Sequence, residues 1–120
     1  MKHMILKGGL VTAFLLAAAT AWAGWWTSYT AIANLDATEG GGYRVYPVGS
    51  ALNSGSNPCS HSDYAEVIGS ATPEARAEYN RLLLSAFLSG KKVRLFLSSH
   101  SSNCIDGRPV YAEVRVDHLQ

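Results

Sequence analysis

Residues 72–97 of the chain are TPEARAEYNRLLLSAFLSGKKVRLFL, and they predict one helix followed by a strand. Thr72 is a typical N-cap residue, because its hydroxyl can accept a hydrogen bond from a free amide of the first turn. Pro73 suits the first helical position, where no amide partner is lost, and Gly90 is typical of the C-terminal end. The apolar side chains at spacings of three and four are Ala75, Tyr79, Leu82, Leu83, Ala86 and Phe87. We expect this face to lie in the core.

Five β-strands are predicted around this helix. Residues 25–33 and 43–48 are rich in aromatic and β-branched side chains, and a glycine-rich turn joins them as a hairpin. A short third strand is expected over 64–68. Apolar and polar side chains alternate over 92–97 and again over 110–117, which predicts the last two strands.

This order of elements predicts a mostly β (α+β) fold. A lone helix between the third and fourth of five strands is the order of the OB-fold, a five-stranded, partly open barrel. In an OB-like fold the apolar face of the helix closes the open end of the barrel. A plain α+β sandwich built from the same elements is the alternative that the pattern leaves open.

The first 23 residues have the three-part pattern of a secretory signal peptide. Lys2 and Lys7 make a basic start, and residues 10–19 form an apolar run. An Ala-x-Ala triplet then ends at residue 23. The run is shorter than the roughly 20 residues that span a bilayer, so a retained anchor is the less favoured alternative. We expect a signal peptide over 1–23, a single OB-like domain over 24–120, and export to the periplasm or out of the cell.

The charge of the expected mature chain excludes several partners. Without Lys2 and Lys7 it carries 8 basic and 9 acidic side chains, a net charge of −1. Nucleic-acid binding needs a clustered basic face. The nearest basic cluster, Lys91, Lys92 and Arg94, is typical of a solvated strand start. We therefore expect no nucleic-acid partner and, after signal cleavage, no membrane association.

Cys59 and Cys104 are the only two cysteines of the chain. In an oxidising compartment two cysteines allow one intramolecular pairing, so we predict a disulfide between them. The alternative is a zinc site, because Cys59, His61, His100 and Cys104 together form a structural zinc ligand set. Oxidised cysteines cannot bind a metal, so the disulfide is favoured and we expect no metal or other cofactor.

No catalytic constellation is evident, and we expect no enzymatic activity. The acid–base candidates are His61, Asp63, Glu66, His100, Asp106 and His118. A serine hydrolase needs a nucleophile held on a fixed turn, and the chain has no Gly-x-Ser-x-Gly. Its serines lie mostly in polar loops.

Residues 78–95 resemble the equivalent stretch of the B subunits of AB5 toxins of the subtilase-cytotoxin and typhoid-toxin type. Those subunits also have a signal peptide, a tryptophan just after the cleavage point, and a helix that ends in a Gly-x-x-Val-Arg run, here Gly90 to Arg94. The resemblance implies an OB-fold subunit that forms pentameric rings and binds cell-surface glycans. The family's sugar-contacting residues have no residue-by-residue match here. Its cysteine pattern and C-terminal extension also differ, so the resemblance bears on fold and export more than on toxin function.

Two hypotheses for function follow. Exposed tryptophan and tyrosine side chains are common platforms for sugars, and Ser28 and Tyr29 are the expected ligand contacts. The first hypothesis is an exported module that binds a cell-surface glycan, with a homo-oligomer as one expected form. The alternative is a periplasmic accessory or inhibitor domain that binds a protein partner through a strand edge or loop.

Overall fold

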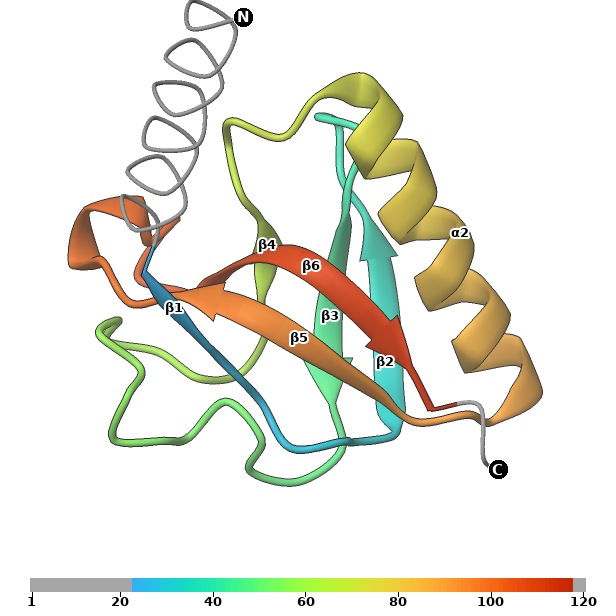
Figure 1. Cartoon of the computed structure of the whole chain (residues 1–120), viewed down its shortest axis with the longest axis horizontal. Helices are drawn as coiled ribbons and strands as arrows, with labels where there is room; N and C mark the ends of the chain where they lie inside the picture. Colours follow the sequence, from blue (N-terminus) through green and yellow to red (C-terminus); the bar gives the residue numbers. More distant parts are fainter. Residues whose placement is uncertain (1–22, 118–120) are drawn as a thin grey trace, which may run out of the picture.

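The computed structural model describes residues 23–117, so the predicted signal peptide, apart from Ala23, lies outside the described residues. This part of the chain is mostly β with a single α-helix, which confirms the α+β class (Figure 1). Its elements are β1 (Gly24–Trp26), β2 (Ile32–Ala37), β3 (Tyr43–Pro47), β4 (Glu66–Val67), α2 (Pro73–Ser89), β5 (Val93–Ser98), the 3₁₀ turn η1 (Ser101–Asn103) and β6 (Val110–Val116).

The strands form two sheets. One has four strands in the order β1-β5-β6-β4, and the other consists of β2 and β3. Strand β4 runs parallel to β6, and the remaining pairs are antiparallel. An isolated bridge between Val45 and Ala65 connects β3 to the residue just before β4. The strands are not closed into a single barrel.

The prediction of five strands is wrong for residues 23–117, which contain six. The expected strand over 25–33 is divided into β1 and β2, which belong to different sheets. The division begins at Thr27, whose buried hydroxyl accepts a hydrogen bond from the Leu95 amide at 3.0 Å. A side-chain oxygen there takes the place of a backbone carbonyl, so the regular pairing of β1 with β5 ends.

The caps of α2 are as the sequence predicts. The Thr72 hydroxyl accepts a hydrogen bond from the Ala75 amide at 3.1 Å. Gly90 has a φ of 72°, which glycine adopts without strain, and its amide donates to the Ala86 carbonyl. Leu83 and Ala86 are fully buried, as expected. Phe87 was expected in the core, but 38% of it is exposed, whereas its neighbour Ala86 is fully buried.

Two polar side chains of α2 hold the β2–β3 hairpin. Arg76 donates to the carbonyls of Ala71 at 3.1 Å and Gly40 at 3.4 Å. Asn80 donates to the Gly41 carbonyl at 2.7 Å. The helix is thus fastened to the hairpin turn by hydrogen bonds to backbone carbonyls.

The core lies between α2 and the inner faces of both sheets. Tyr111 is its largest fully buried side chain, and its hydroxyl donates to the Tyr43 carbonyl at 2.7 Å. Burial raises the pKa of the Tyr111 hydroxyl far above its usual value. The buried cluster consists of Ile32, Val45, Leu52, Ala65, Val67, Leu83, Ala86, Val93, Leu95, Leu97, Tyr111 and Val114. Within residues 23–117, no helix has the length and apolar character needed to cross a bilayer.

Candidate functional site

A pocket of about 480 Å³ lies beside the segment that leads from β1 to β2. Both predicted ligand contacts, Ser28 and Tyr29, are exposed and line it. That they contact a ligand remains a prediction. The lining residues are Trp25, Trp26, Ser28, Tyr29, Thr30, Val48, Ser50, Ala51, Ser54 and Ser56.

The two walls of the pocket are tied together at Thr30. Its hydroxyl donates to the Val48 carbonyl at 2.8 Å. Its amide and carbonyl both bond to Val93, at 2.8 and 2.9 Å. The segment that carries Ser28 and Tyr29 is therefore anchored to β5 on one side and to the loop after β3 on the other.

The lining combines aromatic rings with hydroxyl groups. Trp25, Trp26 and Tyr29 supply flat apolar faces, and the remaining lining residues are mainly serines. The indole nitrogen of Trp25 is buried without a hydrogen-bond partner and does not reach the pocket surface, because Trp25 packs against the core. Rings that stack on apolar faces and hydroxyls that exchange hydrogen bonds suit an uncharged polar ligand.

Next to the pocket, two arginines contact two aromatic rings on the outer face of β1, β5 and β6. We call this group the arginine stack, and it consists of Tyr29, Arg94, Trp26 and Arg115. The Arg94 guanidinium carbon lies 4.6 Å from the Trp26 ring centre and 5.2 Å from that of Tyr29. The Arg115 guanidinium carbon lies 4.8 Å from Trp26. The sequence pattern indicated that Arg94 is simply solvated; instead it is half-buried between two aromatic rings.

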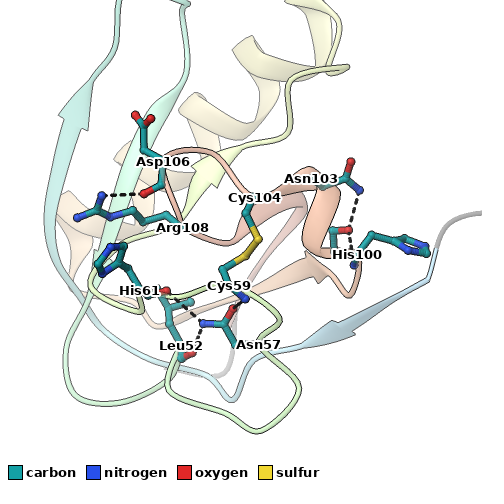
Figure 2. Close-up of a disulfide and its surroundings, with 10 residues drawn as sticks. Leu52, Asn57, Cys59, His61, His100, Asn103, Cys104, Asp106 and Arg108 are labelled. Atoms are coloured by element: carbon teal, nitrogen blue, oxygen red, sulfur yellow. Dashed lines mark hydrogen bonds between the residues drawn. A yellow bond between two sulfur atoms is a disulfide. The ribbon is translucent and has the colours of Figure 1, made fainter.

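The predicted disulfide is present (Figure 2). Cys59 and Cys104 are bonded, with their Cα atoms 5.9 Å apart. Asn57 braces the loop around it: its side-chain oxygen accepts from the Cys59 amide at 2.9 Å, and its side-chain nitrogen donates to the Leu52 carbonyl at 3.0 Å. The bond joins the long loop after β3 to the connection between β5 and β6.

The two histidines that flank the cysteines do not form a site with them. Figure 2 shows His61 and His100 on opposite sides of the disulfide, with their rings pointing away from each other. Both sulfurs are used in the bond, so the zinc ligand set of the alternative hypothesis is not available. Within residues 23–117, no group of three or more His, Cys, Asp or Glu side chains is placed to hold a metal.

The other acid–base candidates act as partners of arginines or lie in turns. Asp63 forms a two-point ion pair with Arg108, with distances of 3.0 and 3.2 Å, which lowers the pKa of Asp63. Glu66 is buried and pairs with Arg44 at 2.5 Å. Asp106 lies in a tight turn with a φ of 50°. The remaining candidate, His118, lies outside the described residues.

Much of this site could not be found from the sequence. Residues 48–56, which form one wall of the pocket, have no sequence pattern beyond that of a polar loop. The register that places Arg94 opposite Arg115 is not encoded locally, although the alternation of 92–97 and 110–117 already places both side chains on the solvent face of their strands. Comparisons with protein-family models, curated proteins and solved structures found no match for this chain.

Proposed function

We propose that this chain is an exported, non-enzymatic binding protein and that the pocket beside Ser28 and Tyr29 takes a cell-surface glycan. The lining of the pocket carries this proposal. Sugars present apolar C–H faces and a rim of hydroxyls, and the pocket offers aromatic rings and serine hydroxyls that match both. The Thr30 hydrogen bonds hold this surface in place before any ligand arrives.

We further propose that the fold is an OB-fold of the kind found in AB5 toxin B subunits. The pairing order supports this, because β1-β5-β6-β4 continues through the Val45–Ala65 bridge to β3 and then to β2. Strand β2 follows β1 along the chain, and the Thr30–Val93 bridge lies between them. Each neighbour in this series is linked by backbone hydrogen bonds, as a strongly curled sheet requires.

Export is supported by the signal-peptide pattern together with the disulfide, since such bonds persist in oxidising compartments. Expression of the full chain in a bacterium, followed by N-terminal sequencing of the periplasmic and secreted fractions, tests this part. We expect a mature chain that begins at Gly24 and contains no free thiol. A full-length chain that remains in the cytoplasm with two free thiols would contradict it.

A glycan array tests the pocket. We expect the purified protein to bind a defined group of glycans and Tyr29→Ala to lose that binding. Ser28→Ala should weaken it about tenfold, since one hydrogen bond contributes roughly that much. Ser102→Ala is the matched control, because Ser102 is also exposed but lies in η1, outside the pocket lining. If no glycan binds, or if Ser102→Ala weakens binding as much as Ser28→Ala, the proposal is wrong.

A second candidate function is favoured by the outer face of α2. Leu84, Phe87 and Leu88 are exposed at spacings of three and four on its last turns, and Leu88 is 75% exposed. Such a face is typical of a contact with a protein, either a periplasmic partner or a second copy of the chain. Light scattering tests self-association: a homo-oligomer that Leu88→Glu converts to a monomer would place this face in its interface.

A further inference from the structure

We infer that the arginine stack is a binding site for a tetrahedral oxyanion, that is, a sulfate or phosphate group, held by the N–H groups of Arg94 and Arg115. This inference does not rest on the glycan proposal, because its ligand contacts are two arginines outside the pocket lining. Trp26 and Tyr29 belong both to the arginine stack and to the pocket lining. It is carried by the placement of two guanidinium groups without acidic partners.

Arg94 and Arg115 are directly opposite each other in the antiparallel pair β5–β6, so their side chains leave the same face of the sheet. Like charges in directly opposite positions destabilise a sheet. Within residues 23–117, neither guanidinium forms an ion pair with a carboxylate, whereas Arg44, Arg81 and Arg108 each do. Neither of the two adjacent positive charges is neutralised by a direct ion pair within the described residues, and Glu113 and Asp117 each lie two residues from Arg115 in the sequence.

The stacking leaves the terminal N–H groups of both side chains available. A guanidinium that stacks on an aromatic ring uses its flat face, while its N–H groups point outward in the plane. The Nε of Arg94 is buried, so the terminal nitrogens of Arg94 are the ones that can contact an anion. Trp26, which contacts both guanidinium groups, limits their freedom before a ligand binds.

These features favour a compact group with two negative charges. A sulfate or phosphate has oxygens on several sides and can accept hydrogen bonds from two arginines at once. A single carboxylate would balance only one of the two charges. Glu113 is on the same face, opposite Phe96 and two residues from Arg115, without an ion pair to either arginine. Its charge opposes anion binding.

The test is a titration of the purified, oxidised protein with sodium sulfate and with sodium phosphate. Sodium chloride keeps the ionic strength constant. Tryptophan emission reports on Trp25 and Trp26, and calorimetry measures binding. We expect saturable binding that Arg94→Gln and Arg115→Gln each weaken about tenfold, the value of one charge-assisted hydrogen bond. Arg81→Gln is the matched control, because it removes the same charge from a helix position paired with Glu78.

Two further measurements separate binding from folding and identify the source of the group. Glu113→Gln should bind sulfate more tightly than the parent protein, which a purely structural stack would not do. Galactose 6-sulfate and vesicles containing phosphatidic acid show whether a sugar or a lipid carries the group, and binding of either supports the site. The inference is overturned if neither sulfate nor phosphate gives saturable binding. It is also overturned if Arg94→Gln and Arg115→Gln, folded by circular dichroism, bind as the parent does.

Discussion

Val45 and Ala65 exchange two backbone hydrogen bonds, each 3.0 Å long, and both residues are fully buried. This reciprocal pair is the bridge between the two sheets, since it links β3 to the residue that precedes β4. Because it lies within the core, the hairpin of β2 and β3 and the four-stranded sheet share one buried interior. The stability of the whole domain therefore depends on packing at this junction and beneath α2.

Leu83→Ala should destabilise the protein by about 2–5 kcal/mol, because it removes a fully buried side chain of α2 and leaves a cavity. Leu88→Ala is the matched control on the same helix. With 75% of Leu88 exposed, its truncation should change the free energy of unfolding by no more than about 0.5 kcal/mol. Urea denaturation measures both. Equal losses in the two variants would contradict the orientation of the helix.

Replacement of both Cys59 and Cys104 by serine should cost about 4 kcal/mol. The two residues are 45 positions apart, and a crosslink that closes a loop of this length restricts the unfolded chain by roughly that amount. Urea unfolding of the oxidised protein and of the double variant, compared with the reduced protein, measures the effect. If reduction of the natural protein leaves its denaturation midpoint unchanged, the disulfide does not contribute as proposed.

Two glycines allow the cost of a left-handed backbone conformation to be measured separately from the cost of a steric clash with an added Cβ. Gly49 and Gly107 have positive φ values of 78° and 76°. A Cβ at Gly49 would meet nothing within 4 Å, whereas one at Gly107 would lie 2.6 Å from the Ser60 hydroxyl oxygen and 2.7 Å from a carbon of the His61 ring.

Gly49→Ala should therefore cost only the left-handed backbone penalty of about 1–2 kcal/mol. Gly107→Ala should cost a further 1–3 kcal/mol or so, because the loop that contains Ser60 and His61 has to move. Thermal unfolding followed by circular dichroism ranks the two variants. The opposite ranking would mean that the 59–61 loop does not pack on this turn.

The ion pair between Asp63 and Arg108 should make a small, acid-sensitive contribution to stability. The hydrogen bonds from Arg108 lower the pKa of Asp63 in the folded protein. The contribution is therefore complete above the unfolded pKa of about 3.9 and is lost as the pH falls through the lower, folded pKa. Half of the Asp63 side chain is exposed, so we expect no more than about 1 kcal/mol.

Denaturation of the natural protein and of Asp63→Asn between pH 7 and pH 2 measures this contribution. The variant should be the less stable of the two at pH 7, and the difference should vanish in acid. A difference that persists at pH 2 would point to a cause other than the charge of Asp63.

Features that depend on neighbouring residues could be predicted from the sequence. The caps of α2 are an example, because Thr72 bonds to Ala75 and Gly90 to Ala86, three and four residues away. The later strands follow from alternation within single segments. The disulfide followed from an expected oxidising compartment and from there being only one possible pairing.

Features that join distant segments were decided by the tertiary structure. The first expected strand divides at Thr27 because its hydroxyl meets the amide of Leu95, 68 residues further on. Ser28 and Tyr29 could be named from the sequence, but the pocket they line exists because Thr30 binds Val48 and Val93.

The sequence by itself determined the class of the fold, the limits of its helix and the partner of each cysteine, since these follow from local hydrogen bonding, periodicity and count. The division of the first strand, the pocket and the opposition of Arg94 and Arg115 depend on which strands pair and in what register. Strand pairing and register are set by the burial of the whole core, so they cannot be predicted from any single segment.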